Sequence, residues 1–559
     1  MQRVTLISMY DEYCLGVRYM SALLQREGHS VHVILFKGVE FITPRDVPPP
    51  ERQEEGGYYA YASYVSRTEL ELVLDLLRKQ EPHLVGISFS SINFGVAQFL
   101  TEQIRKRLGV PVIWGGVDST INPETNIPYT DMLCVGEGEY PLLNLVNAMD
   151  RGKDITCIPS IWVNRDGTIY RNPVMKLEQN PDKYPFPDFE PANKTLILND
   201  RISEALYPPH SHLYTNFMIM GARGCPFTCS YCCSGHYRKI YKGDCIIRQR
   251  SPENVIRELE YRLETWPWPL QRVEFYDDVL PANKAWIREF SPLYAERVGL
   301  PFFGYTHPNV GDPENLALLQ KAGLHYLIMG IQSGSQRVLK EVLNRRHTKE
   351  RTIQTAQNIL DTGAKLLVDF IGYNPLVREE DNVETLELLC DLPRPFGIIK
   401  INPMAYYDNY VITEIAMKEG ILDQLERPKG VHAYQAIMKP EYIFWEYLHT
   451  LAQFDGFTKE HLMGLAKDGY LRENPEILEE IVTNFYRTTY QGGNPVAHKD
   501  QYIDELHRRL AEFENSRIMA VYRKAGNWLR GRNRMKKLYR FLRRSLSRNG
   551  RKGPVGFRV

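Results

Sequence analysis

The chain contains the segment Gly221-Ala222-Arg223-Gly224-Cys225-Pro226-Phe227-Thr228-Cys229-Ser230-Tyr231-Cys232, in which three cysteines follow the spacing C-x3-C-x2-C. Three thiolates on one loop can hold three irons of a cubic iron–sulfur cluster and leave the fourth iron without a protein ligand. That open iron can bind a substrate or cofactor, whereas a cluster with four cysteine ligands is usually a closed electron carrier. The two glycines let the backbone pass close to a bulky group, and the proline stiffens the turn. The segment predicts an open iron–sulfur centre.

Zinc binding and inert thiols are the alternatives for these cysteines. A structural zinc site normally needs four ligands, and Cys232, Cys233 and His236 supply only part of one, with no second C-x2-C pair nearby. A disulfide framework is disfavoured because nine cysteines in 559 residues are sparse. The spacing favours the open cluster over both alternatives.

The cysteine segment, with the aromatic Tyr231 just before its third cysteine, resembles that of the radical S-adenosylmethionine (SAM) enzymes. The resemblance implies that Cys225, Cys229 and Cys232 are the catalytic centre and the ligands of a [4Fe-4S] cluster, with Tyr231 among the cofactor contacts. It also implies that SAM chelates the open iron and is cleaved by one electron to a 5′-deoxyadenosyl radical. An external electron donor of the flavodoxin or ferredoxin type is then an expected partner.

The bulk composition is that of a soluble protein with several domains. Hydrophobic residues make up 43% and charged residues 25% of the chain. No run of about eighteen apolar residues exists, so we expect no membrane span. The first residues enter a predicted strand at once, and we expect no targeting peptide. The remaining cysteines are scattered, as in a reducing cytoplasm, and we expect a cytoplasmic protein.

The C-terminal tail, residues 517–559, is strongly basic, although the net charge of the whole chain is only +1. It contains fifteen Lys and Arg and no Asp or Glu, so the rest of the chain is acidic. Its apolar residues Met535, Leu538, Leu542 and Leu546 form one helical stripe among cations. Such a helix is typical of binding to an anionic membrane surface, which would place the protein peripherally at a membrane. Docking on the acidic body, nucleic acid and disorder are the alternatives, and no nucleic-acid signal is clear.

Residues 1–150 predict a doubly wound α/β domain. Short apolar strands at 4–8, 31–36, 83–88 and 111–114 alternate with helices at 15–27, 70–79 and 96–108, and the run 131–139 closes the unit. Ligands of such sheets bind beyond the C-terminal strand edges, where the loops 8–16, 88–93 and 115–119 are expected to meet. Taken alone, this pattern suits a flavodoxin-like or nucleotide-binding domain, or a plain structural sheet.

Placed before a radical SAM segment, this domain resembles the cobalamin-binding domain of the cobalamin-dependent (class B) radical SAM enzymes. The residues that carry the resemblance are Ser88, Ser90, Gly115, Gly116, Gly136 and Glu137. Domains that ligate cobalt from below carry D-x-H-x-x-G, and here that frame reads Asp11-Glu12-Tyr13-Cys14-Leu15-Gly16. Tyr13 replaces the histidine, so the resemblance implies a cobalamin site that includes Tyr13 and Gly16 but lacks a protein imidazole.

Residues 151–205 are rich in Pro and Asn and predict a linker, and residues 206–405 predict a partial barrel of six βα units. Its strands are expected at 215–220, 272–276, 301–305, 325–330, 366–372 and 397–402, with chemistry at their C-terminal ends. Residues 406–516 are aromatic-rich and predict a helical region that caps the barrel and shapes a substrate pocket.

The resemblance extends to two strand ends of this barrel. It implies SAM contacts at Glu274 and Asp277 in the first, and at Gln332 and Ser333 in the second, where glutamine stands in place of the more usual glutamate. A surface or capping role is the alternative for each. Strand-end position alone suggests further pocket-lining residues: Tyr305, His307 and Tyr373.

The resemblance favours a cobalamin-dependent radical SAM methyltransferase. One SAM would methylate cobalamin, a second would generate the radical that abstracts hydrogen from an unactivated carbon, and that carbon would take the methyl group. The main alternative uses the same cofactors for cyclisation, ring rearrangement or oxidation without methyl transfer. A methylthiotransferase, which needs an extra cysteine cluster, and a non-catalytic cobalamin or iron–sulfur sensor are less favoured. The substrate class stays open among small molecules, lipids and peptides.

Overall fold

The computed structural model describes residues 1–37, 53–60, 63–207, 211–280, 283–454, 457–479 and 482. The chain divides into two compact units, the first made of Met1–Arg378 and Asn402–Ile437 and the second of Glu379–Ile401 and the residues from Met438 onward. The basic helix predicted within residues 517–559 lies outside the described residues. In the part of the chain that is described, no helix has the length and apolarity needed to cross a membrane.

The N-terminal part of the first unit is built on a nine-stranded sheet with the order β11-β10-β2-β1-β5-β6-β7-β8-β9. Its central strands are parallel and are rich in Val, Ile and Leu, as expected for strands buried on both faces. They are β1 (Arg3–Met9), β2 (Ser30–Phe36), β5 (Leu84–Ser88), β6 (Val112–Gly115) and β7 (Met132–Cys134). The predicted doubly wound fold is confirmed.

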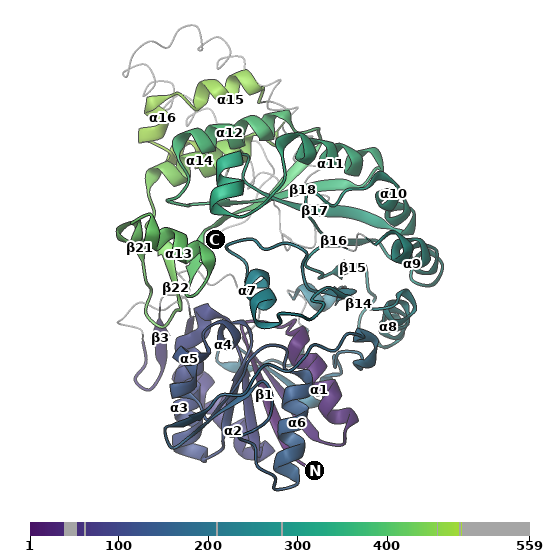
Figure 1. Cartoon of the computed structure of the whole chain (residues 1–559), viewed down its shortest axis with the longest axis vertical. Helices are drawn as coiled ribbons and strands as arrows, with labels where there is room; N and C mark the ends of the chain where they lie inside the picture. The colour runs from purple at the N-terminus through teal and green to yellow at the C-terminus, as the bar shows by residue number, and fades with distance from the viewer. Residues whose placement is uncertain are drawn as a thin grey trace, which may run out of the picture. The chain divides into compact units, whose positions relative to one another are not determined.

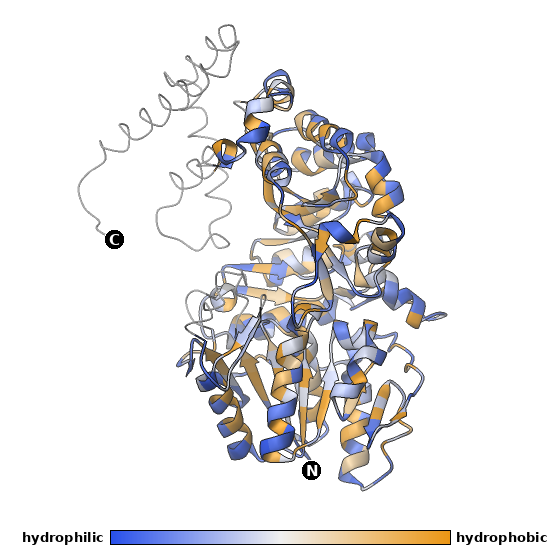
Figure 2. Ribbon diagram, turned by 90° about the vertical axis from the view of Figure 1, so that its left-hand side faces the viewer, coloured by the Kyte–Doolittle hydropathy of each residue, from blue (hydrophilic) through white to orange (hydrophobic). Residues whose placement is uncertain are grey.

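Helices cover both faces of this sheet (Figure 1). α1 (Leu15–Arg26) and α6 (Glu139–Asp150) pack on one face, and α2 (Arg67–Gln80) and α3 (Phe94–Leu108) pack on the other. Figure 2 shows the strands largely hydrophobic and the helices with hydrophilic outer stretches. α2 begins with a capping box in which Ser66 and Glu69 satisfy each other's backbone N–H groups. The short elements here are β3 (Tyr58–Ala60), β4 (Ser63–Val65), α4 (Val117–Ile121) and α5 (Pro123–Asn126).

The predicted linker, residues 151–205, belongs to this sheet instead of merely connecting domains. β8 (Ile161–Arg165) and β9 (Thr168–Tyr170) extend one edge, and β10 (Lys194–Leu198) and β11 (Arg201–Ile202) extend the other. The prolines that suggested a linker lie between these two strand pairs, where the chain passes from one edge to the other. Because these prolines lie outside the strands, they remove no hydrogen bond from the sheet.

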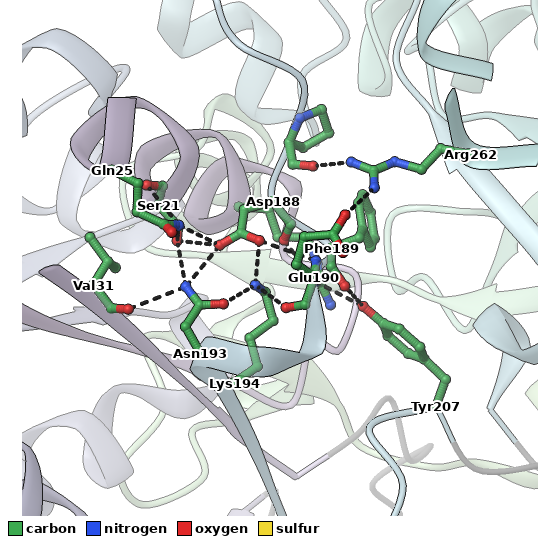
Figure 3. Close-up of polar contacts among 12 residues, drawn as sticks. Ser21, Gln25, Val31, Asp188, Phe189, Glu190, Asn193, Lys194, Tyr207 and Arg262 are labelled. Carbon is green, nitrogen blue, oxygen red and sulfur yellow. Dashed lines mark hydrogen bonds and ion pairs between the residues drawn. The ribbon is translucent and has the colours of Figure 1, made fainter. Parts of the chain in front are cut away.

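A buried polar network fixes β10 against α1 (Figure 3). Lys194 Nζ lies 2.6 Å from Asp188 Oδ1, and the Lys194 side chain is 0% exposed. The other carboxylate oxygen accepts hydrogen bonds from Ser21 (2.6 Å) and Gln25 (2.8 Å) of α1 and from Asn193 (3.0 Å). The network satisfies a buried charge pair from both sides, as burial of charge requires.

The second half of the chain forms a six-stranded sheet in sequential order, β12-β15-β16-β17-β18-β19. Its strands are β12 (Asn216–Ile219), β15 (Arg272–Phe275), β16 (Phe302–Thr306), β17 (Leu324–Gln332), β18 (Lys365–Gly372) and β19 (Phe396–Pro403). All six predicted barrel strands are present, and the predicted partial barrel is confirmed. The pairs from β12 to β18 are parallel, so their C-terminal ends meet at one edge.

Helices follow the barrel strands, as the βα rhythm predicts. They are α8 (Pro252–Thr265), α9 (Lys284–Arg297), α10 (Pro313–Ala322), α11 (Lys349–Asp361) and α12 (Glu379–Asp391). Ser251 caps α8 by accepting from the Asn254 N–H, with Pro252 at the first helical position. Two short strands, β13 (Ala222–Arg223) and β14 (Arg248–Gln249), pair antiparallel on either side of α7 (Cys233–Ile240).

The region after the barrel is only partly the helical cap that we predicted for residues 406–516. β20 (Ala405–Tyr407), β21 (Leu425–Glu426) and β22 (Ala433–Ala436) form a small antiparallel sheet with α13 (Val411–Lys418) in the first unit. The second unit holds α14 (Pro440–Leu451), α15 (Lys459–Leu465) and α16 (Gly469–Glu473). The described residues of this region are therefore mainly helical, as predicted, and the short sheet is an addition that aromatic residues also suit.

The small sheet is anchored on the N-terminal sheet by a buried carboxylate. Asp118 of α4 is 0% exposed and accepts hydrogen bonds from Ser91 (2.6 Å), Asn122 (2.7 Å) and Asn126 (2.8 Å). His432 Nδ1 lies 3.0 Å from the same carboxylate. The His432 contact ties residues 402–437 to this carboxylate, which Ser91, Asn122 and Asn126 hold in place within the N-terminal half of the first unit.

Candidate active site

A cavity of about 400 Å³ opens at the C-terminal edge of the N-terminal sheet. The loops after β1, β6 and β7 and the end of β5 line it, which is where a doubly wound sheet binds its ligand. Residues from the cysteine half of the chain line it as well: Met220, Ala222, Arg223, Gly224, Tyr237, Tyr276 and Asp278. A ligand in this cavity therefore contacts both halves of the first unit.

Glycines shape this cavity for a bulky occupant. A Cβ added to Gly16 or Gly115 would meet no atom within 4 Å, so these two lining residues leave open space on the cavity side. Gly116 has φ 96°, and a Cβ there would lie 2.6 Å from the Phe89 carbonyl oxygen. A Cβ on Gly86 would lie 2.8 Å from a methyl group of Leu6. The open space beside Gly16 and Gly115 fits a bulky group such as a corrin at this edge.

The loop after β1 is held rigidly beside the cavity. Asp11 Oδ1 accepts from the backbone N–H groups of Tyr13 (3.0 Å) and Cys14 (2.9 Å). Arg18 is fully buried and donates to the carbonyl oxygens of Tyr13 and Glu12, each at 2.8 Å. Asp11, Cys14 and Gly16 line the cavity, but Tyr13, which we predicted to contact the cofactor, does not.

Tyr13 belongs to the barrel side of this loop. Burial, together with the nearby carboxylates of Glu12 and Glu274, raises the pKa of Tyr13. Glu274 is on β15, so the phenol lies among barrel residues. A neutral phenol there supplies no cobalt ligand.

Most of the other residues predicted to contact cobalamin line the cavity, and one does not. Ser88, Gly115, Gly116, Gly136 and Glu137 all line the cavity. Ser90 does not line it and is exposed, and its hydroxyl accepts from Asn93 Nδ2 at 3.5 Å. Five of these six residues therefore remain candidates for cobalamin contact.

The cysteine loop leaves the end of β12 and is fixed at several points. Asp277 is buried and its Oδ1 accepts from the Gly221 N–H at 2.7 Å. Burial raises the pKa of Asp277 to about 7. Ser230 N donates to the Leu343 carbonyl at 3.0 Å, and the Phe227 ring stacks on His307 with centroids 3.7 Å apart. These contacts assign Asp277 a loop-supporting role in addition to its predicted place at a SAM site.

The three predicted cluster ligands are free thiols on this loop. Cys229 is buried, and Cys225 and Cys232 are half-buried. Burial raises the pKa of Cys225 to about 12, whereas the hydrogen bond of Cys233 lowers the pKa of Cys232 to about 6. Iron–sulfur clusters bind the deprotonated thiolate, so Cys225 would lose its proton on binding the cluster.

The described residues contain no group of three or more His, Cys, Asp or Glu side chains converging on one metal ion. A cubic cluster does not need such a point, because each thiolate binds a different iron. Three separate free thiols along one loop therefore fit a cluster as the donor set.

A buried cation that the sequence did not single out lies beside these thiols. Arg345 Nη1 lies 3.4 Å from Cys229 Sγ and 3.1 Å from the Tyr231 hydroxyl. Arg345 Nη2 donates to the Gly330 carbonyl at 2.5 Å, which ties it to β17. Arg345 follows a π-turn, Val338–Val342, and no local motif marks it. It brings the predicted SAM strand end and the cysteine loop together.

The predicted SAM residues lie at the ends of their strands. Glu274 accepts from the Tyr305 hydroxyl at 2.7 Å and is only 4% exposed. Gln332 ends β17 with φ 66°, and its Nε2 lies 3.4 Å from Asp369 Oδ2. Ser333 Oγ accepts from the Ser335 N–H at 3.1 Å. Each has a protein partner, so their contact with SAM stays a prediction.

Two residues at the same edge, Tyr276 and Asp278, were not predicted. Both line the cavity, and the negative charge of Asp278 contributes to raising the pKa of Cys225. Asp278 therefore lies between the cavity and the cysteine loop. Its neighbour in sequence, Asp277, was singled out in its place, because a pair of adjacent carboxylates gives no signal of which one turns inward.

Comparison with known proteins identifies both halves of this site. A family profile described as the radical SAM superfamily matches residues 219–389, and one described as the B12 binding domain matches residues 4–146. The chain is 26% identical over 316 residues to an uncharacterized methyltransferase, PH0819, of Pyrococcus horikoshii, covering 55% of this chain and 64% of that one. It is 24% identical over 406 residues to the anaerobic magnesium-protoporphyrin IX monomethyl ester cyclase of Rubrivivax gelatinosus, covering 69% and 68%. The chain thus spans about two thirds of these relatives.

The fold has a solved counterpart. The cobalamin-dependent SAM radical enzyme OxsB, with aqua-cobalamin and SAM bound, superposes with a TM-score of 0.60 at 14% identity. The match covers 99% of this chain and 85% of that one. At this identity the likeness shows the arrangement of the two domains in sequence and their fold.

Proposed function

The chain is a cobalamin-dependent radical SAM enzyme, and from this premise we propose that it transfers a methyl group to an unactivated carbon of a small-molecule substrate. One observation carries the proposal: a single cavity is lined both by the cobalamin-binding loops and by residues 222–224, directly before Cys225. The similarity to a methyltransferase of Pyrococcus horikoshii supports it.

The chain's own residues divide the work. Cys225, Cys229 and Cys232 hold the cluster, and Arg345 donates to the Cys229 thiolate. The glycine-lined cavity holds cobalamin. When bound, the cluster with SAM supplies a 5′-deoxyadenosyl radical for hydrogen abstraction, and cobalamin supplies a methyl group that a carbon radical can accept.

The test is product analysis with anaerobically reconstituted protein. Methyl transfer requires 5′-deoxyadenosine, S-adenosylhomocysteine and a product heavier than the substrate by one CH2 unit. Cys229→Ala should abolish 5′-deoxyadenosine formation, whereas Cys245→Ala, at an exposed cysteine outside the motif, should leave it intact. Formation of 5′-deoxyadenosine without S-adenosylhomocysteine would contradict methyl transfer.

The similarity to the magnesium-protoporphyrin cyclase favours a second candidate, a cyclisation or oxidation with the same cofactors. The two candidates differ in product mass, because cyclisation adds no carbon. A tetrapyrrole-type substrate would suit this candidate, whereas lipids and peptides remain further substrate classes for methyl transfer. A flavodoxin or ferredoxin supplies the electron in either case.

We also propose a cytoplasmic protein whose residues 517–559 contact an anionic membrane surface. The charge and apolar stripe of that tail support this proposal. Co-sedimentation with vesicles containing anionic lipid should retain the full chain and lose a variant that ends at residue 516. Equal binding of the two would remove the membrane contact.

A further inference from the structure

Two arginines flank the cysteine loop and stand opposite each other. Arg223 of β13 pairs with Arg248 of β14 in an antiparallel register, and all three predicted cluster ligands lie between them in sequence. Their side chains are only 13% and 3% exposed. Like charges directly opposite each other in a ladder repel, and burial strengthens the repulsion. The pair therefore needs an anion in order to close the loop.

The loop of residues 136–139, which follows β7 and is called the cavity loop below, supplies that anion. Glu137 Oε2 accepts from Arg223 Nη1 at 3.2 Å and from Arg248 Nη1 at 3.0 Å, and its Oε1 contacts Arg248 Nη2. Glu139 adds a second carboxylate, 2.7 Å from Arg223 Nη1. Burial by itself would raise the pKa of Glu137, but Arg248 and Arg223 outweigh burial and lower it. The two arginines and the two carboxylates therefore form a group with no net charge.

Further contacts hold this ion-pair network in place. The Arg223 guanidinium lies 4.8 Å from the Tyr19 ring and 4.7 Å from the Tyr184 ring, so it is held between two aromatic faces. The Glu137 N–H donates to the Tyr241 hydroxyl at 2.6 Å, directly after α7. One residue of the cavity loop, Glu137, therefore binds the loop that carries the cysteines at its start, at its end and between them.

The same loop, residues 136–139, forms part of the cavity wall. Gly136, Glu137, Gly138, Glu139 and Arg223 all line the cavity. An occupant of the cavity would therefore pack against both Glu137 and Arg223. Contacts that hold these two residues in place favour the conformation in which the cysteine loop is closed, and this is the differential contact that coupling requires.

We propose that Glu137 is a positioning residue that couples the two cofactor sites, so that cobalamin in the cavity strengthens retention of the iron–sulfur cluster. By linkage, the cluster strengthens cobalamin binding by the same factor. The inference rests on the proposed function only in requiring both cofactors. It needs no particular substrate and no methyl transfer.

The test compares iron release from the reconstituted full chain. A ferrous chelator removes iron from the cluster with and without bound hydroxocobalamin, and iron content and the cluster's electron paramagnetic resonance (EPR) signal are followed. We expect hydroxocobalamin to slow release at least about fivefold, the lower range of coupling between linked sites. The hydroxocobalamin Kd should be higher for cluster-free protein than for cluster-loaded protein, because equilibrium coupling is reciprocal.

Glu137→Gln keeps the size of the side chain and removes its charge. With hydroxocobalamin added to saturation, the ratio of release rates in this variant should fall toward one. Glu124→Gln is the matched control, because Arg171 binds the Glu124 carboxylate through two hydrogen bonds of 2.8 Å on the surface of the same domain. This control should keep the wild-type ratio. Arg248→Lys retains the charge but loses the two-point contact, and it should give an intermediate ratio even if Glu137→Gln folds poorly.

Several outcomes would overturn the coupling. They are equal release rates in wild-type protein that holds both cofactors, an unchanged ratio in Glu137→Gln or Arg248→Lys, or an absence of cobalamin binding. Equal rates with normal methyl transfer would leave the proposed function standing. Normal coupling without any methylated product would overturn the proposed function alone.

Discussion

The guanidinium of Arg345 lies 3.4 Å from Cys229 Sγ, and both side chains are buried. We propose Cys229 as a cluster ligand, and a charge-assisted hydrogen bond to its thiolate would stabilise the reduced, more negative state of the cluster more than the oxidised state. The position of this one cation therefore bears on how readily the centre accepts its electron.

We predict that Arg345→Gln lowers the midpoint potential of the reconstituted cluster on the order of 50 mV, because a hydrogen bond to a charged group is worth about 1.5–3 kcal/mol and part of it differs between the oxidation states. An EPR-monitored redox titration measures the shift. Arg346→Gln, at the exposed neighbouring position, should leave the potential unchanged. An equal potential in Arg345→Gln and wild type would show that the hydrogen bond does not form in the loaded protein.

Gly115 tests the cavity. Gly115→Ala places a methyl group where no protein atom lies within 4 Å, so the fold should be little affected. Cobalamin binding should weaken on the order of tenfold, since an extra methyl group in a packed site costs about 1–3 kcal/mol. Equilibrium dialysis with hydroxocobalamin measures the Kd. Gly464→Ala, which also meets no atom but lies in α15, is the control, and equal losses in both variants would count against the cavity as the site.

The pH dependence of folding stability tests whether Asp277 supports the cysteine loop as a buried carboxyl group. Burial raises the pKa of Asp277 from 3.8 to about 7 in the folded chain. Between these values the folded chain keeps a proton that the unfolded chain has lost, so this residue makes stability fall as pH rises from about 4 to about 7 and stay level above. The full effect is at most about 4 kcal/mol.

Asp277→Asn retains an oxygen that accepts from Gly221 and removes the ionisation. We expect the variant to gain stability relative to wild type at pH 8 compared with pH 5, measured as the midpoint of urea unfolding. Asp166→Asn, in an exposed turn, should show no such gain. A difference between variant and wild type that does not change with pH would mean that Asp277 ionises normally.

Lys194 tests the network that holds β10 to α1. Lys194→Met leaves the buried Asp188 carboxylate without its cation and should destabilise the first unit by about 3–5 kcal/mol, seen as a lower thermal unfolding temperature. Combining it with Asp188→Asn removes the stranded charge, and the double variant should recover part of the loss. Lys183→Met breaks a surface pair with Glu178 and should cost at most about 1 kcal/mol. A double variant no better than the single one would contradict a stranded charge.

The sequence could predict the strands and the cysteine loop because their signals are local. The run Val31–Phe36 is apolar and β-branched, and Ser251-Pro252 marks a helix start in any context. The spacing of Cys225, Cys229 and Cys232 fixes all three thiols on one loop. Each of these features depends on residues close in the chain.

The remainder depends on residues far apart in the chain. Arg345 reaches Cys229 from 116 positions away, and no local pattern distinguishes it from its exposed neighbour Arg346. Tyr13 stands at the expected position of its motif, yet it is buried near Glu274 of the barrel. Glu137 lines the cavity as predicted, but its arginine partners lie more than eighty residues ahead. Contacts between such distant residues depend on the three-dimensional fold, and no local pattern in the sequence marks them.

The edge strands β8 to β11 have a consequence for synthesis. β10 pairs with β2, and β8 pairs with β7, so a fragment ending at residue 150 would leave both of these inner strands as open edges. Unpaired edges are templates for aggregation. On the ribosome, the N-terminal sheet cannot be completed until residue 202 has emerged, by which point the cysteine loop is about to follow. During synthesis, the sheet of the B12-binding domain is therefore completed only shortly before the cysteine loop is made.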